Sequence, residues 1–554
     1  MTDMHAAPAE PGPKPTGGAG AGADGPRGTG RFLARAAAVT AALTAAGSLC
    51  GLLRDQVIAQ LFGADADTDA FLVAWTVPEL ASTLLIEDAM ALVLVPAFSV
   101  ALSLRETGHR GGTVHTPGPD PVRELVRTTL PRLSLWLAGA GVALALAAPF
   151  LVRAMAPGLT DPGTAVDCMR LVSLNVVTFG AAGYCSALLR AHRSFVAPAA
   201  IYVTYNAAII ASMLAGHSAW GVRSAAVGVA VGGALMVAVQ LPAFFRRLPA
   251  VRRDCAAGNR RRRGAANLTL LTFGMLAPVT IFALSRQAQV FYERFLASSL
   301  PAGAISHLNY AQKVAQMPMV LSLMVCTVTF PVVARAMADG EPERARRRVE
   351  RDLGLVGVVV LLGTAYVVAC APQIVQLLFE RGEFGPRDTA DTASVMRVYS
   401  CGLLGHSLVG ALARPFFSGI RPGWYPAVAM GAGLAVTGAV GAATVGPWGV
   451  HGIAAANAAG ITTTALLLMR GLGAHVIAID VRAVTKGLLR LLLAAAAAAA
   501  AGWAAARVPD APLPATVVGG VTVLLVFASV ALLVRASEVA QLLTALGRRL
   551  VHVR

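Results

Sequence analysis

Long apolar runs constrain this chain more than any other feature of its sequence. They are about 20 residues long and recur from Ala36 almost to the C-terminus, and each can cross a bilayer as a helix. Only 14% of the residues are charged, against about a quarter in soluble domains. Because a helix satisfies its own backbone hydrogen bonds in lipid, the sequence predicts an all-α, polytopic membrane protein.

The runs divide into about 14 candidate spans, each near the length that a bilayer requires. Their approximate limits are 36–61, 69–103, 128–153, 166–190, 196–215, 221–245, 268–298, 304–337, 353–379, 392–416, 424–444, 449–472, 484–506 and 514–535. The second run is too long for one straight helix. Pro78 and Pro96 predict breaks in it, because proline cannot donate the backbone hydrogen bond of a helix.

Lysine and arginine concentrate in alternate connections between the spans. Odd-numbered connections such as GADADT (63–68) and GHSAWG (216–221) are poor in them, with ERGEFGPRDTAD (380–391) as the exception. Even-numbered connections such as LRAHRS (189–194) and ERARRRVER (343–351) are basic. By the positive-inside rule both termini are cytoplasmic. We therefore interpret the net charge of +17 as loop charge and not as a nucleic-acid surface, since no nucleic-acid motif occurs.

An internal repeat divides the chain into two halves. LLRAHRSFVAPA (188–199) aligns without gaps on FFSGIRPGWYPA (416–427), and both are expected turns between a fourth and a fifth span of their half. An even number of spans per half makes such a repeat parallel, related by an axis along the membrane normal. We expect two six-helix lobes around a central cavity, plus two C-terminal helices.

Composition sets the expected boundaries of these parts. The first residues are rich in Gly, Pro and Ala, a composition that cannot bury a core. The expected division is a disordered cytoplasmic tail (1–31), an N-lobe (32–246), a basic cytoplasmic linker (247–266), a C-lobe (267–473), and helices 13 and 14 with a short cytoplasmic tail (474–554).

Charged residues inside the apolar runs point to function, because they are costly in a membrane. They cluster in the first two spans of each expected lobe: Arg54, Asp55, Asp69, Glu79, Glu87, Asp88, Arg286, Glu293, Arg294 and Lys313. Such clustering suggests a water-filled cavity lined mainly by spans one, two, seven and eight. As substrate-binding candidates in that cavity we name Arg54, Asp55, Glu87, Arg286 and Lys313.

Several of these charges also have structural interpretations. Arg54 and Asp55 could pair with neighbouring helices, since adjacent positions on one helix do not face each other. Asp69 follows a Thr in ADADTD and fits a helix N-cap. Glu293 and Arg294 lie near the outer end of span seven and could snorkel. With Pro78, the residues Asp69, Glu293 and Arg294 form our structural or gating candidates.

No enzyme signature is found. The expected extracytoplasmic loops are too short to hold an active site, and no GxxxxGK[ST] loop for nucleotide occurs. The seven cysteines and ten histidines are scattered without ligand spacing. We therefore predict a transporter with no catalytic residue, cofactor or metal site.

Several motifs resemble one known family. GLLRDQVIAQLFGADADTDAFLVAWTVPELASTLL (51–85), LRAHRSFVAPA (189–199), ERFLASSLPAGAISHLNYAQKVAQMP (293–318), FPVVAR (330–335) and LLFERGEFGPRDT (377–389) are similar to signatures of the MurJ/MviN family. Its members are lipid II flippases of the multidrug/oligosaccharidyl-lipid/polysaccharide exporter superfamily. The resemblance implies 14 helices, two six-helix lobes and an extra C-terminal pair.

The resemblance also implies a function. Such proteins carry an undecaprenyl-pyrophosphate-linked disaccharide-pentapeptide from the inner to the outer leaflet of the bacterial cytoplasmic membrane, by alternating access, for peptidoglycan biosynthesis. A cationic cavity would bind the headgroup through Arg, and the lipid tail would follow a groove near spans 13 and 14. The expected partners are this lipid-linked precursor, the bilayer and cell-wall synthesis proteins. We expect a monomer.

The chain also departs from the family pattern. Members usually have an Arg at three positions where this chain has Leu49, Ser82 and Thr83. They usually also have the motif NYADR, and this chain has NYAQK, in which Gln312 replaces the acid and Lys313 the Arg. The cavity has thus lost cations. Two alternatives follow from this loss: an exporter of another polyprenyl-linked glycan or amphiphilic metabolite, or a non-transporting cell-wall scaffold.

Overall fold

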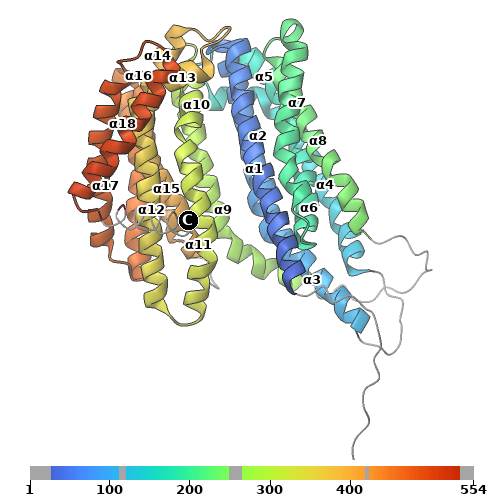
Figure 1. Cartoon of the computed structure of the whole chain (residues 1–554). Coiled ribbons are helices and arrows are strands. Elements are labelled where there is room, and N and C mark those ends of the chain that lie inside the picture. The colour runs from blue at the N-terminus through green and yellow to red at the C-terminus, as the bar shows by residue number, and fades with distance from the viewer. Residues whose placement is uncertain (1–25, 111–119, 249–264, 418–422, 537–538, 540–554) are drawn as a thin grey trace, which may run out of the picture.

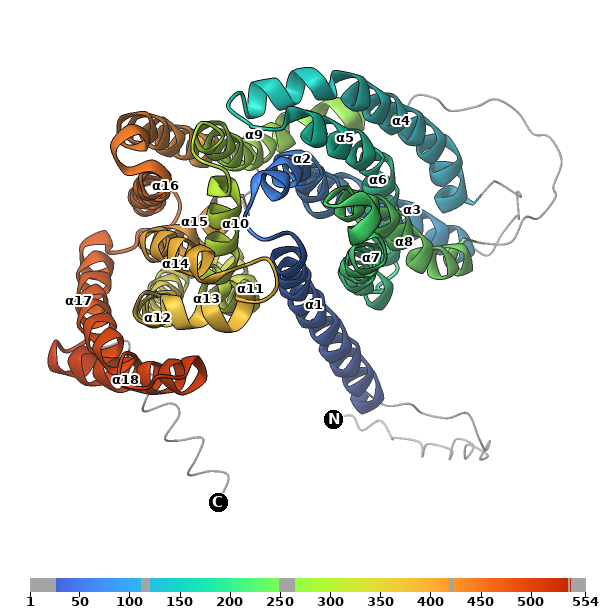
Figure 2. The same ribbon diagram turned by 90° about the horizontal axis from the view of Figure 1, so that it is seen from above.

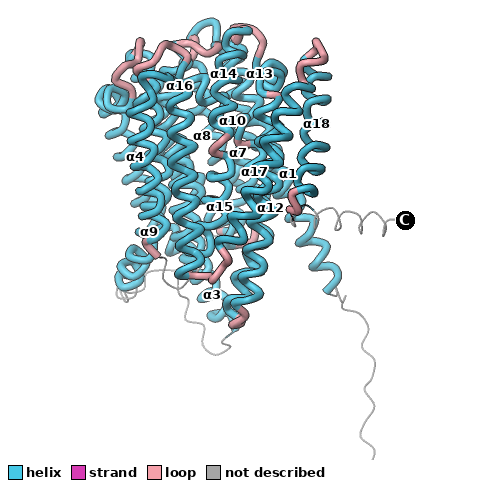
Figure 3. The backbone as a smooth tube through the Cα atoms, turned by 90° about the vertical axis from the view of Figure 1, so that its left-hand side faces the viewer, coloured by secondary structure: helices cyan, strands magenta, loops and turns pink. Residues whose placement is uncertain are grey.

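The computed structural model describes residues 26–110, 120–248, 265–417, 423–536 and 539. These described residues form helices and short turns, with no strand among them. The tube in Figure 3 shows the helices running roughly alongside one another, with the turns gathered at two opposite faces. This arrangement confirms the predicted all-α class.

The first eight α-helices form one group, called here the N-lobe (Figure 1, blue to green). Within it α7 packs against α8, and α1 against α7. The helices of the N-lobe are α1 (Pro26–Phe62), α2 (Ala66–Ser82), a π-helix (Thr83–Asp88), α3 (Ala89–Arg110), α4 (Pro121–Met155), α5 (Pro162–Ser173), α6 (Asn175–Ala191), α7 (Val196–Trp220) and α8 (Arg223–Arg247).

The next eight helices form the C-lobe, and the last two lie at its outer edge (Figure 2, red). In this half α9 packs against α16, and α12 against α17. The helices are α9 (Ala265–Ala297), α10 (Ala304–Ala315), α11 (Met317–Ala338), α12 (Pro342–Ala369), α13 (Ala371–Phe379), α14 (Pro386–Ser400), α15 (Leu403–Phe417), α16 (Tyr425–His475), α17 (Val481–Ala505) and α18 (Pro512–Leu533).

All of the expected spans fall on helices, but several are broken. With α5 and α6 taken together, eight helical segments in the described ranges are long and apolar enough to cross a membrane, or nine if α14 and α15, bent by 46°, count as one span. The run 69–103 is interrupted at the π-helix between α2 and α3, whereas Pro78 and Pro96 lie inside those helices. The count of fourteen spans stays a prediction.

One backbone turn occurs at matching places in the two lobes. Gly221 joins α7 to α8 with φ 54°, and Gly449 bends α16 with φ 53°, a left-handed region that favours glycine. Both glycines stand in the sequence Trp-Gly-Val. They are 228 positions apart, which is also the separation of Arg193 and Arg421 in the predicted repeat. Tyr425 and Leu467, from the two halves of α16, are joined by a hydrogen bond, so this helix is a hairpin.

The two lobes contact each other at one face, the upper one in Figure 1. Tyr310 of the C-lobe donates from its hydroxyl to Gly63 O at 3.2 Å, and Glu383 N donates to Gln60 O at 3.0 Å. Gly158 N donates to Ser298 Oγ at 3.3 Å. These contacts, together with those that Asp69 makes, are called the seam.

Candidate functional site

The first part of the site is built around Arg54 on α1. Its Nε and Nη2 donate to Asp55 Oδ1 at 3.0 and 2.7 Å, and its Nη1 donates to Asn206 Oδ1 on α7 at 2.8 Å. The guanidinium lies over the Trp75 ring of α2, 4.4 Å from its centroid. A planar guanidinium can bind a carboxylate, an amide and an aromatic face together. Three helices of the N-lobe therefore meet at this one side chain.

The Arg54–Asp55 contact differs from the expectation drawn from helix geometry. Adjacent positions were expected to pair with other helices, yet the two side chains bond to each other. Nε and Nη2 of the arginine reach the neighbouring carboxylate, while Nη1 reaches α7 and the guanidinium rests on Trp75 of α2. Asp55 is 5% exposed, so its charge needs this partner.

The second part of the site is an ion pair between the lobes. Lys313 Nζ of α10 donates to Glu79 Oε1 of α2 at 2.9 Å, with side chains 32% and 39% exposed. Glu79 is also within the electrostatic reach of Arg54 and Arg294. Lys313 lies ten residues after Gly303, about 15 Å along the axis of α10. Among the hydrogen bonds that join the lobes in the described part of the chain, the Lys313–Glu79 bond lies furthest from the seam.

Arg286 on α9 is not brought to this pair. Within the described ranges its side chain is exposed and makes neither an ion pair nor a hydrogen bond. The Glu87 side chain, also predicted to line the cavity, lies outside the described residues, and its backbone belongs to the π-helix. Pro78 is buried in α2, one residue before Glu79.

Asp69 corrects one prediction. It was expected to cap its own helix, but the N-cap of α2 is Asp65, whose carboxylate accepts from Ala66 N at 2.7 Å. Asp69 lies inside α2 and reaches the other lobe, where it accepts from Gly303 N at 2.9 Å and from Ser306 N at 2.7 Å. A carboxylate of the N-lobe therefore caps the N-terminus of α10.

Glu293 and Arg294 correct a second prediction, that they snorkel. Both are buried, at 3% and 4% exposure. Arg294 donates to Ile305 O at 3.1 Å and to Asn309 Oδ1 at 3.2 Å, and so ties the end of α9 to α10. Glu293 accepts a hydrogen bond from Asn457 of α16. The helix end that carries these residues is packed inside the C-lobe and not at a water interface.

Glu293 ends a chain of buried polar groups. Asn457 Oδ1 contacts His406 Nε2 at 2.9 Å, and His406 Nε2 contacts the Tyr399 hydroxyl at 3.4 Å. Gln316 donates to the same hydroxyl at 3.0 Å. His406 is thus a hydrogen-bonding residue of the C-lobe. Among the described residues no group of three or more His, Cys, Asp or Glu could hold a metal ion.

Uncharged residues of the site were missed from the sequence. Asn206, Trp75 and Asn457 make the contacts that fix Arg54 and Glu293. Single amides within otherwise apolar runs, as in YNAAII (205–210), are the signal that points to such positions. An amide in a membrane span requires partners just as a charge does.

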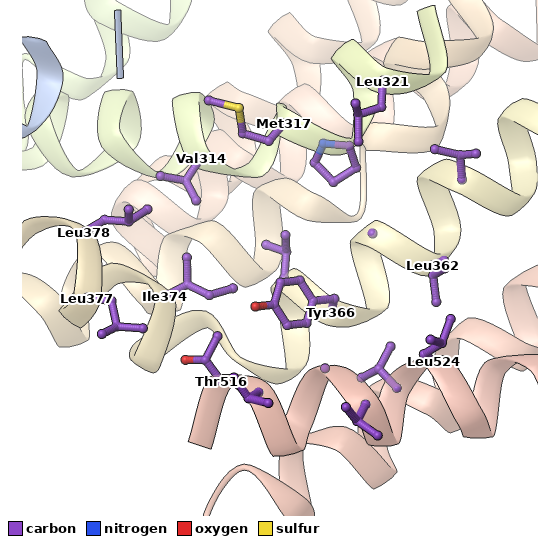
Figure 4. Close-up of a pocket in the computed structure, with 18 of the residues that line it drawn as sticks. Val314, Met317, Leu321, Leu362, Tyr366, Ile374, Leu377, Leu378, Thr516 and Leu524 are labelled. Carbon is purple, nitrogen blue, oxygen red and sulfur yellow. The ribbon is translucent and has the colours of Figure 1, made fainter. Parts of the chain in front are cut away.

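An apolar cavity of about 800 Å³ lies beside the C-lobe, toward α18. Figure 4 shows Met317 and Leu321 of α11 facing Leu362 and Tyr366 of α12, with Leu524 of α18 closing the far side. The cavity adjoins α10 through Val314, which is next to Lys313 in the sequence. Its lining suits an alkyl or isoprenoid chain.

Comparison with known proteins gives one family. Residues 58–513 match the sequence profile described as "Lipid II flippase MurJ". A "Lipid II flippase MurJ" of Burkholderia cenocepacia is 27% identical over 395 residues, covering 70% of this chain and 73% of the relative.

Solved structures agree on the fold. "Lipid II flippase MurJ, inward closed conformation" has a TM-score of 0.69 and 15% identity, covering 89% of this chain and 98% of that one. An inward-facing multidrug resistance MATE family transporter of the MOP superfamily has a TM-score of 0.63 and 14% identity, covering 81% and 99%. At these identities the likeness concerns the fold alone.

Proposed function

The chain belongs to the MurJ family of lipid II flippases, and from this premise we propose that it carries a polyprenyl-diphosphate-linked peptidoglycan precursor from the inner to the outer leaflet of a bacterial membrane. The single observation that carries the proposal is the family match over residues 58–513. Of the predicted cavity residues, this range includes Glu87, Arg286 and Lys313. The remaining cavity residues, Arg54 and Asp55, directly precede it.

The headgroup presents the main physical difficulty. A diphosphate and its sugars must pass a medium in which charge is costly. Arg54 and Lys313 supply cations from the two lobes, and arginine and lysine donate charge-assisted hydrogen bonds to phosphate oxygens. The exposed Arg286 adds a third cation along α9. We assign headgroup binding to these three residues, with Asp55 positioning Arg54.

The lipid tail needs a separate path, because a long apolar chain gains nothing from entering a hydrated cavity. The apolar cavity between α11, α12 and α18 supports such a path. It lies next to α10, so a tail held there leaves the headgroup near Lys313. The family resemblance implied a tail groove near the last two helices, and the position of this cavity against α18 supports that expectation.

Alternating access requires that one face is closed while the other admits substrate. In the described part of the chain, the hydrogen bonds between the lobes lie at the seam, apart from the deeper Lys313–Glu79 bond. This distribution supports closure at that face. The positive-inside rule makes the opposite face cytoplasmic. The structure would then represent the state that accepts precursor from the inner leaflet, and opening of the seam would release it outside.

Complementation tests this function. Expression of the chain during depletion of an essential lipid II flippase should restore growth and cell shape, and purified protein in vesicles should expose the precursor on the far leaflet. Failure of both assays would contradict the proposal. Assays in cells would also show whether cell-wall synthesis proteins associate with the chain and whether it acts as a monomer.

A second candidate is export of a less anionic lipid-linked glycan. The observation in its favour is that Arg54 and Lys313 each already contact a carboxylate, Asp55 and Glu79. A site whose cations are neutralised in this way attracts a diphosphate less strongly. Translocation of a polyprenyl monophosphate sugar in preference to the diphosphate precursor, measured in the same vesicles, would favour this candidate.

A further inference from the structure

Positive charge from both lobes converges on one carboxylate, that of Glu79. Lys313 Nζ of α10 donates to it at 2.9 Å. Arg54 of α1 and Arg294 of α9 act on it electrostatically. Glu79 lies one helical turn after Trp75, the ring on which the Arg54 guanidinium rests. The carboxylate therefore occupies the place where an anion bound by both lobes would lie.

The Glu79–Lys313 pair is accessible, in contrast to the other ion pair of the site. The Lys313 and Glu79 side chains are 32% and 39% exposed, whereas those of Arg54 and Asp55 are 12% and 7% exposed. Ion pairs of such exposure contribute little to stability, because water and salt screen them. A diphosphate carries more negative charge than one carboxylate and also forms charge-assisted hydrogen bonds to an ammonium. Glu79 can thus be replaced by an incoming phosphate, while Asp55 stays on Arg54.

We propose that Glu79 is an intramolecular stand-in for the anionic headgroup: its carboxylate occupies Lys313 in the empty protein, and a phosphate of the substrate displaces it. The identity of the anion rests on the proposed function, and the occupation of Lys313 rests on the contacts above. Displacement removes an ion pair between α2 and α10, the same two helices that Asp69 joins at the seam. Headgroup binding therefore weakens the contact between the lobes as it occurs.

A double-mutant cycle on the full-length protein in lipid nanodiscs tests this inference. The probes are inorganic pyrophosphate and a polyprenyl diphosphate, and their affinities are measured for the wild type, Glu79→Gln, Lys313→Gln and the double variant. Glu79→Gln should bind both probes about two- to fivefold more tightly, the factor that a partly exposed ion pair is worth. Asp167→Asn removes an exposed carboxylate on α5 that pairs with Arg223, and serves as the charge-matched control with unchanged affinity.

The cycle separates displacement from simple charge repulsion. If Glu79 occupies Lys313, the gain in affinity disappears when Lys313 is Gln. An equal gain in both backgrounds, or no gain in either, overturns the inference, and so does the absence of pyrophosphate binding in every form. Translocation of the lipid-linked precursor in vesicles reports on the proposed function by itself. A Lys313-dependent gain without translocation would contradict that function and leave the stand-in role supported.

Discussion

The Asp69 carboxylate on α2 accepts hydrogen bonds from the backbone N–H groups of both Gly303 and Ser306, so a side chain of one lobe caps a helix of the other. A helix N-terminus has unpaired N–H groups and a partial positive charge. Because these are satisfied across the seam and not within the C-lobe, opening of this face must break them. Asp69 is therefore the residue whose loss should most directly favour the open seam.

We predict that Asp69→Ala opens the seam. Loss of an N-cap costs about 0.5–2 kcal/mol, which corresponds to a shift of roughly two- to thirtyfold between closed and open forms. The measurement is labelling of Ala304→Cys, buried in the first turn of α10, by a membrane-impermeant maleimide in a cysteine-free background. Asp67→Asn, an exposed acid on the same turn of α2, is the control. Equal labelling of both variants would show that Asp69 does not hold the seam.

We predict that Arg54→Ala destabilises the protein and abolishes transport. It leaves the buried Asp55 without its partner, and an uncompensated buried charge costs about 3–5 kcal/mol. Arg54→Ala/Asp55→Ala removes both charges and should recover most of the thermal stability in detergent. Precursor translocation should not recover, because the guanidinium would be the headgroup ligand. Recovery of transport in the double variant would mean that Arg54 has a purely structural role.

The sequence predicted the class of this fold well. A helix in lipid must form all of its own backbone hydrogen bonds, and its apolar surface is visible in the sequence as a long apolar run. It also selected Arg54, Asp69 and Lys313, each of which forms a hydrogen bond to another helix in the structure. It did not predict their partners. The Glu79–Lys313 and Asp69–Ser306 contacts join residues more than 230 positions apart, and no local spacing encodes such a distance.

The two errors in the site have the same physical origin. ADADTD offers several acids at the start of α2, and a cap pattern alone does not tell Asp65, which caps that helix, from Asp69, which caps another. Likewise Glu293 and Arg294 stand at a helix end, where snorkelling into water is the usual outcome. Here α10 and α16 cover that end, and only the tertiary packing shows it.

We predict that Asn457→Ala destabilises the C-lobe. Its amide donates to the buried Glu293 carboxylate and its oxygen contacts His406, so removal leaves two buried polar groups without this partner. The expected cost is about 1–3 kcal/mol, seen as a lower unfolding temperature in detergent. Thr463→Ala, which loses only a bond to Ala459 O in the same half of α16, should change the temperature little. A similar fall in both variants would contradict a special role for Asn457.

We predict a pH-dependent contribution to stability from Asp161, in the turn between α4 and α5. Hydrogen bonds from the Thr164 hydroxyl and from backbone N–H groups lower the pKa of its carboxyl, which caps α5. Since the pKa is lower in the folded than in the unfolded protein, the stabilisation is present above an unfolded pKa of about 3.9 and is lost as the pH falls through the folded pKa. The unfolding temperature of Asp161→Ala should therefore approach that of the wild type in acid. A constant difference from neutral to acidic pH would contradict this.

We predict that filling the apolar cavity impairs binding of the lipid tail but not of the headgroup. Val521 of α18 lines the cavity, and Leu525, one turn further along the same helix, does not. Val521→Trp should weaken binding of a polyprenyl diphosphate in nanodiscs about tenfold, since each buried methylene contributes about 0.8 kcal/mol and the bulky ring excludes a few of them. Binding of inorganic pyrophosphate should not change, because this probe has no lipid tail to enter the cavity. Leu525→Trp controls for the added indole, and equal weakening by both variants would place the tail elsewhere.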